Sequence, residues 1–187
     1  KVIDYTWGQV VDQASRMAAH LKSHGITPGA RVAMLSKNCA HFIITELAIW
    51  MAGGTTVAIF PTETAETIRY VLDHSEASLL FVGKLDGWEG MRPGVPDGLP
   101  CIAHPLAPDS ARKAYPGWDE IVARTEPMPG HPVRPADELC TIIYTSGTTG
   151  FPKGATLSHH NILNNGYFVG QALRYTHEDR ICIPVPF

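Results

Sequence analysis

Apolar residues along the chain alternate between stretches with helical spacing and short continuous runs. Between Val10 and Leu21 they recur at helical spacing, after a pair with capping-box spacing, Thr6 and Gln9, and before a candidate helix stop at Gly25. A short apolar run with strand character follows. The sequence therefore predicts an N-terminal helix that leads into a strand.

The same alternation continues through the next fifty residues. We expect a second helix at 39–52, capped by Asn38, and a third at 65–76. The strands expected before, between and after these helices lie at 31–35, 55–60 and 78–82. Three successive strand–helix alternations favour an α/β fold with a largely parallel sheet and helices on both faces.

The pattern weakens between residues 83 and 137, where glycine and proline are frequent and a helix is predicted only at 117–125. We interpret this stretch as a long surface excursion, because a strand at 139–144 then resumes the earlier pattern. Further elements are expected after it: a short strand at 154–158, a helix at 159–173 capped by Ser158, and a strand at 180–185.

Composition indicates a folded protein and excludes several classes. The chain of 187 residues is 44% hydrophobic and 18% charged, with a formal charge of −3 and no basic run, which argues against nucleic-acid binding. The four cysteines form no CxxC pair, so we expect reduced thiols and a cytoplasmic location. The longest apolar tract, 42–60, contains Glu46 and is divided by Gly53 and Gly54, which favours a buried helix and strand over a membrane span. Peripheral membrane contact is left open.

One short stretch concentrates groups that could bind an anion. Directly after the strand that ends at Tyr144 stand the residues TSGTTGFPKG, which combine hydroxyls, glycines and a single lysine. Hydroxyls and bare backbone amides form concave anion sites, and a lysine adds a positive charge. The residues of this candidate phosphate-binding loop are Thr145, Ser146, Gly147, Thr148, Thr149, Gly150 and Lys153.

The position of the loop supports this interpretation over a flexible linker or an ordinary polar turn. Phosphate loops follow a buried strand at the carboxyl edge of a sheet, and here the loop is held between two expected strands. It is not a Walker A loop, because Lys153 follows Pro152 and precedes Gly154.

The segment YTSGTTGFPKGATLSHHNI, from Tyr144 to Ile162, resembles the signature of the adenylate-forming superfamily, which includes acyl-CoA synthetases, luciferases and peptide-synthetase adenylation domains. The resemblance extends over the whole chain. Residues 1–140 are most similar to long-chain fatty-acyl-CoA ligases and residues 150–173 to medium-chain or general fatty-acid ligases, which leaves the chain-length preference open.

The resemblance implies an ATP-dependent reaction in two steps. A fatty acid attacks the α-phosphorus of ATP to give an acyl-adenylate and pyrophosphate, and coenzyme A then displaces AMP to form the thioester. The loop residues Thr145 to Lys153 would hold the ATP phosphates alongside Mg²⁺. The resemblance assigns the catalytic lysine and the metal-binding acid to later segments, so it places no catalytic residue and no metal ligand within these 187 residues.

The resemblance also implies that residues 1–187 are the N-terminal portion of an AMP-binding domain whose C-terminal domain is absent, so that the chain alone is inactive. Two alternatives are a non-enzymatic nucleotide-binding module and a peptide-synthetase adenylation domain. His159 and His160 follow the loop, and we expect them to cap or line the next helix rather than to take part in chemistry.

Overall fold

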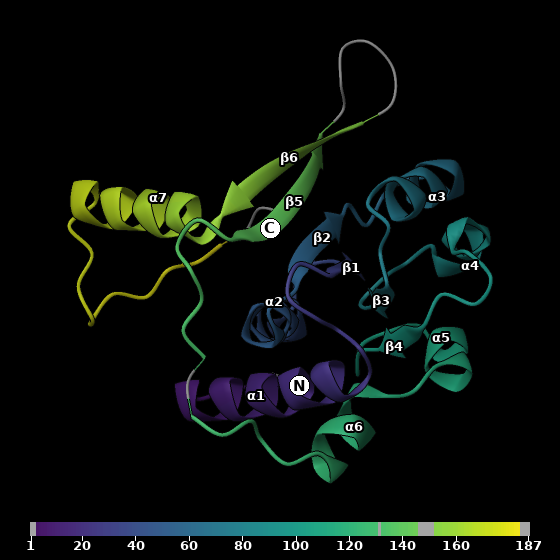
Figure 1. Cartoon of the computed structure of the whole chain (residues 1–187), viewed down its shortest axis with the longest axis horizontal. Helices are drawn as coiled ribbons and strands as arrows, with labels where there is room; N and C mark the ends of the chain where they lie inside the picture. The colour runs from purple at the N-terminus through teal and green to yellow at the C-terminus, as the bar shows by residue number, and fades with distance from the viewer. Residues whose placement is uncertain (1–2, 131, 146–151, 184–187) are drawn as a thin grey trace.

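The computed structural model describes residues 3–130, 132–145 and 152–183 and arranges them around one mixed sheet (Figure 1). The helices are α1 (Trp7–Ser23), α2 (Ala40–Ala52), α3 (Ala65–His74), α4 (Trp88–Met91), the 3₁₀ helix η1 (Arg92–Gly94), α5 (Asp109–Ala114), α6 (Trp118–Arg124) and α7 (His159–Ala172). The strands are β1 (Arg31–Leu35), β2 (Thr55–Ile59), β3 (Leu79–Val82), β4 (Cys101–Ala103), β5 (Leu139–Thr145) and β6 (Lys153–Ser158).

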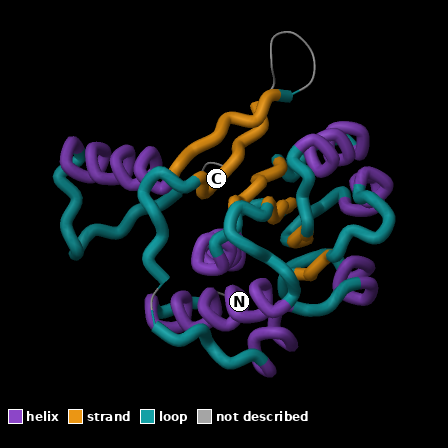
Figure 2. The backbone as a smooth tube through the Cα atoms, in the orientation of Figure 1, coloured by secondary structure: helices purple, strands orange, loops and turns teal. Residues whose placement is uncertain are grey.

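The strand order within the sheet is β4-β3-β1-β2-β5-β6 (Figure 2). All neighbouring pairs are parallel except the last, because β5 and β6 form an antiparallel hairpin. The predicted largely parallel sheet is confirmed, and the four strands expected to share it do so. The β5–β6 hairpin places the ends of the candidate loop side by side.

Helices cover both faces of the sheet, as predicted. Side chains of β1 alternate between the two faces, since Val32 and Met34 join one hydrophobic core and Ala33 and Leu35 the other. The first core receives apolar side chains from α1, α2 and α6, and the second receives them from α3, α4 and α5. Because helices cover both faces of the sheet, the sequences of the parallel strands are continuous apolar runs.

Of the caps predicted for the first two helices, one is confirmed and one is not. Thr6 and Gln9 form the predicted capping box at the start of α1. The cap predicted for α2 was wrong: the helix begins at Ala40, and its N-cap residue is Cys39, which makes no side-chain capping hydrogen bond. The helix ends at Gly53, whose φ of 91° is the left-handed conformation that favours glycine.

The interpretation of residues 83–137 as a surface excursion was wrong in part. The predicted helix there is confirmed as α6, but the segment also contains α4, α5 and the sheet strand β4. Trp88 and Trp118 are buried in the two cores. Much of this segment is therefore part of the folded body, because its short elements bury large aromatic side chains against the sheet.

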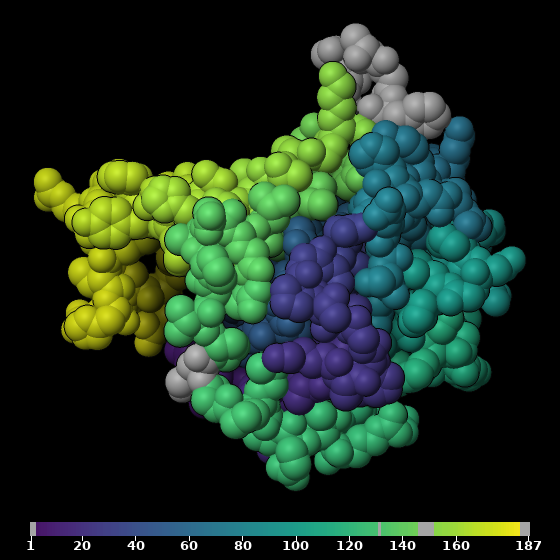
Figure 3. Space-filling view, in the orientation of Figure 1, coloured from purple at the N-terminus to yellow at the C-terminus, as the bar shows by residue number. Residues whose placement is uncertain are grey.

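The end of the described chain also differs from expectation. The strand expected at 180–185 is not formed over Arg180–Ile183, and residues 184 and 185 lie outside the described residues. Ile181 and Ile183 are exposed, and no described strand pairs with them. In Figure 3 the region of α7 projects from the rest of the molecule, and Figure 1 shows the chain turning back after it.

Candidate functional site

The carboxyl edge of the sheet has the topology of a ligand site. β1 leads into α2 on one face, whereas β2 leads into α3 on the other face. In open α/β sheets such a change of direction creates a crevice at the carboxyl ends of the strands. The candidate loop begins at this edge, directly after β5.

Two cavities flank the end of β2, one on each face. The first, of about 310 Å³, is lined mainly by apolar side chains from α2, β2, β5 and α7. The second, of about 480 Å³, has a mixed lining of polar and apolar residues that includes Thr62, Glu63, Thr67, Tyr144 and Pro152. The second cavity borders the described part of the candidate loop at Pro152, and its threonine hydroxyls could bind a phosphate, although its lining also includes the carboxyl of Glu63.

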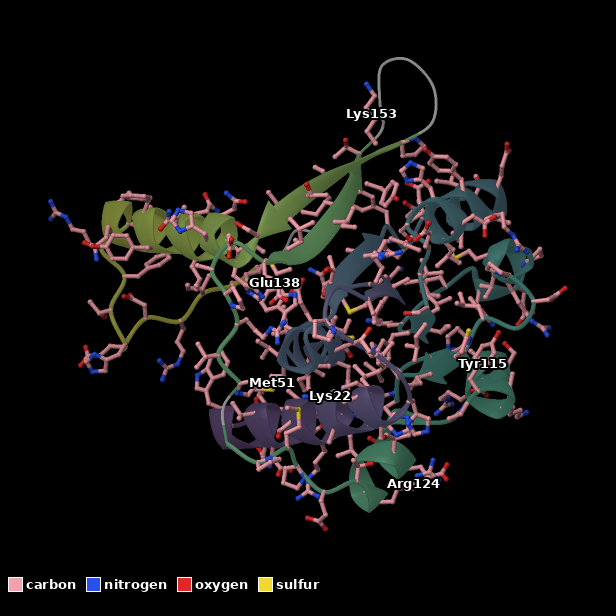
Figure 4. All side chains as sticks on the ribbon, in the orientation of Figure 1. Lys22, Met51, Tyr115, Arg124, Glu138 and Lys153 are labelled. Atoms are coloured by element: carbon pink, nitrogen blue, oxygen red, sulfur yellow. The ribbon has the colours of Figure 1, made fainter. Side chains whose placement is uncertain are left out.

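The structure brings two of the predicted site residues together at the base of the loop. Thr145 ends β5 and lies opposite Lys153, which begins β6, and both residues are exposed. Figure 4 shows Lys153 at the far end of the hairpin, beside the loop. The other predicted site residues lie outside the described residues: Ser146, Gly147, Thr148, Thr149 and Gly150.

Tyr144 lies directly before the candidate loop and is not among the predicted site residues. Its side chain is only 5% exposed, and its hydroxyl lies 2.8 Å from Nδ1 of His74 on α3. The period-2 alternation of β5 could have indicated its direction, since it places Ile142 and Tyr144 on one face and Thr141 and Ile143 on the other. α3 lies beside this face because of the strand order, and the strand order cannot be predicted from the local sequence pattern.

Glu46 is the acid with the most perturbed environment at this edge. It projects from α2 into the wall of the apolar cavity, where burial raises the pKa of its carboxyl to about 7. The pKa of the Cys140 thiol is raised to about 11, first by burial and then by the charge of Glu46. Because this pKa lies near neutral pH, small changes around the carboxyl can change its protonation state.

The two histidines after the loop are far from its base. His159 and His160 begin α7, at the opposite end of β6 from Lys153, as expected for helix-lining residues. The ring of His159 contacts Trp50 edge to face at 5.6 Å, and burial lowers the pKa of His159. Their amides donate to the carbonyls of Glu138 and Ala136. These contacts give both histidines a structural role.

The described part of the chain contains no group of three or more His, Cys, Asp or Glu residues that could hold a metal ion. None of its helices combines the length and the apolar character needed to cross a membrane.

Comparisons with known proteins agree with the fold. A model of the family described as "AMP-binding enzyme" matches residues 1–187. Acyl-CoA ligase SID4 of Ajellomyces capsulatus is 26% identical over 97% of this chain, and the match covers 33% of that ligase. A linear gramicidin synthase of Brevibacillus parabrevis is 31% identical over 89% of this chain and 3% of its own length.

Solved structures show the same fold. The apo structure of MatB from Rhodopseudomonas palustris superposes with a TM-score of 0.78 at 24% identity, over 97% of this chain and 35% of MatB. The chain thus spans about a third of the length of the acyl-CoA ligases that it matches. Because the family model covers the described fold from end to end, the chain belongs to the AMP-binding enzyme family, together with acyl-CoA ligases.

Proposed function

We propose that the chain is the N-terminal third of an AMP-forming acyl-CoA ligase and that it binds the phosphates of ATP at the base of the β5–β6 hairpin. The observation that carries this proposal is the pairing of Thr145 with Lys153 at the carboxyl edge of the sheet, beside the mixed-polarity cavity. A hydroxyl and an ammonium group on facing residues can bind neighbouring phosphate oxygens. Ser146, Gly147, Thr148, Thr149 and Gly150 are proposed to complete the same site.

The residues of this chain would act by stabilising charge. When the carboxylate of the acid attacks the α-phosphorus, negative charge develops on the departing pyrophosphate, and Lys153 would offset it. No general base is needed, because the attacking carboxylate is already ionised near neutral pH. Mg²⁺ would reach such a site on the nucleotide phosphates. The described residues offer it no acidic cluster, so we assign it no step.

The proposed acid substrate is a fatty acid of medium to long chain, and the proposed acceptor of the acyl group is coenzyme A. The signature resemblance and the similarity to acyl-CoA ligases support this choice. One solved structure of MatB that shares the fold is described as ATP-bound, which fits a nucleotide site on this scaffold. The free cysteines Cys39, Cys101, Cys140 and Cys182 fit the proposed cytoplasmic location.

A second candidate is a peptide-synthetase adenylation domain. Its supporting observation is the 31% identity to the linear gramicidin synthase. Such a domain would activate amino acids and pass them to a carrier domain instead of coenzyme A. Pyrophosphate exchange with a panel of fatty acids and amino acids distinguishes the two. Exchange with neither class, together with intact ATP binding, would favour a non-enzymatic nucleotide-binding module.

The phosphate role of Lys153 can be tested in the longer enzyme that carries this chain. Lys153→Ala removes a charge-assisted contact, which should cost about 1.5–3 kcal/mol. The expected result is a loss of roughly 10- to 100-fold in kcat/KM for ATP, with the KM for the acid little changed. Steady-state pyrophosphate release with each substrate varied in turn gives both values.

Lys22→Ala is the matched control, because Lys22 is an exposed lysine on α1, far from the hairpin in Figure 4. It should leave both constants at wild-type values. If Lys153→Ala preserved the ATP kinetics and weakened only the acid substrate, Lys153 would not bind phosphate and the proposed site would be wrong.

A further inference from the structure

The hairpin that carries the candidate loop extends past its neighbour in the sheet. β5 pairs with β2 from Thr141 to Ile143, and the next two residues have no register partner in β2. Tyr144 and Thr145 pair only with β6 among the described strands. Figure 2 shows the tip of the hairpin beyond the ends of the other strands. The register with β2 therefore ends before Tyr144 and Thr145, the two described residues of β5 nearest the loop.

An aromatic cluster on α3 provides an anchor at this level. The Tyr144 hydroxyl lies 2.8 Å from Nδ1 of His74, and the two rings meet edge to face. Tyr70 stacks on His74 with ring centroids 5.2 Å apart and meets Tyr144 edge to face. Such ring pairs are directional contacts, so the cluster fixes the direction of the Tyr144 side chain as well as burying it.

Tyr144 also contacts the strand on the other side of the loop. It lies opposite Gly154, where a Cβ atom would stand 3.3 Å from the Tyr144 ring and 2.8 Å from Cγ2 of Ile142. A glycine at this position allows the ring to lie across β6. A side chain from the strand before the loop thus lies against both the strand after it and α3.

We propose that His74 and Tyr144 are positioning residues for the phosphate-binding loop. Their hydrogen bond fixes the base of the loop against α3 and so determines where Thr145 and Lys153 present their hydroxyl and ammonium groups. This inference rests on the proposed function, since it gives those two groups a phosphate to bind. It also gives the mixed-polarity cavity a fixed wall, because Tyr144 and Thr67 of α3 both line it.

The alternative is that Tyr144 is an ordinary core residue whose hydroxyl happens to be satisfied. The two possibilities differ in what the hydroxyl does. As a core residue, Tyr144→Phe would lower the melting temperature without changing the relative use of the two substrates. As a positioning residue, it would raise the KM for ATP while leaving that for the acid unchanged.

The experiment measures both KM values, kcat and the melting temperature in the longer enzyme. Tyr144→Phe and His74→Ala should each raise the KM for ATP by roughly 3- to 10-fold, and the double variant should be no worse than the more affected single variant. His74→Asn should restore most of the loss, because an Asn side chain can place a hydrogen-bonding atom where Nδ1 lies. If the alanine variant is unstable, the asparagine variant still tests the role of the hydrogen bond.

Tyr115→Phe is the matched control, since it removes a hydroxyl beside α5, away from Lys153 in Figure 4. It should leave the KM for ATP unchanged. If Lys153→Ala impaired ATP use while Tyr144→Phe and His74→Ala did not, the positioning role would be wrong and the phosphate site would stand. If Lys153→Ala had no effect on ATP use, the proposed function would fail and the positioning role with it.

Discussion

Glu46 couples the ionisation of a single carboxyl to the stability of the fold. Burial raises its pKa from the usual value of 4.5 to about 7. In the unfolded chain the carboxyl ionises at the lower pH, so between these two values the folded state binds more protons. Stability contributed by the neutral acid is therefore present below pH 4.5 and is lost as the pH rises towards 7.

Glu46→Gln should consequently stabilise the chain at pH 8 by about 1–3 kcal/mol and change it little at pH 4. Urea unfolding at the two pH values measures the difference. Glu126→Gln, at an exposed position, is the control, and it should change the free energy of unfolding by the same small amount at both pH values. An equal effect of Glu46→Gln at pH 4 and pH 8 would show that the carboxyl is not held in its neutral form.

Residue chemistry explains which parts of the site could be predicted. The composition of the loop identified Thr145 and Lys153, and the structure places them on facing positions of a hairpin. Tyr144 and His74 were missed because they are 70 residues apart and become neighbours only through the strand order. A local pattern states which face a strand residue points to, but not which helix covers that face.

At the level of elements, predictions succeeded where an element buries a long periodic face. The helices α1, α2 and α3 and the strands between them fall close to their expected ranges. β4 was missed because it has only three residues, Cys101–Ala103, too few to show a period. Its pairing with β3 defines it as a strand, and that pairing is a non-local property. The short connection between β5 and β6 also dictates a hairpin, since a parallel crossover needs about a dozen or more residues.

α7 exposes an unusual amount of apolar surface for an element of a folded chain. None of its residues is buried in the described structure. Its exposed large hydrophobic side chains are Leu163, Tyr167, Phe168 and Val169. Contiguous apolar patches of this kind favour association, so we expect the isolated chain to self-associate as its concentration rises.

Leu163→Glu should weaken this self-association about tenfold or more, because burying a leucine contributes about 1.5–3 kcal/mol. Light scattering after size-exclusion chromatography at several concentrations provides the measurement. Asn165→Glu adds the same charge on the same helix without removing apolar surface, and it should have the smaller effect. A wild-type chain that stays monomeric at all concentrations would contradict this expectation.

For the whole molecule, the span of the chain explains why a phosphate-binding loop need not by itself give turnover. The chain spans about a third of the acyl-CoA ligases that it matches, and its described residues place a threonine and a lysine at one end of the proposed nucleotide site. Adenylation also requires the acid and the α-phosphorus to be held in attack geometry. Such positioning can contribute roughly 7–11 kcal/mol to a reaction of two bound substrates.

We therefore expect the 187-residue chain to show no release of pyrophosphate that depends on a fatty acid, whereas the longer enzyme does. Both proteins should be assayed side by side with ATP, Mg²⁺, coenzyme A and fatty acids of several lengths. Acid-dependent release by the purified chain would show that these residues suffice for positioning, which would contradict the view of the chain as one part of the site. A longer protein that binds ATP but releases no pyrophosphate with any acid would instead favour the nucleotide-binding module. In that case the loop would bind phosphates without supporting a reaction.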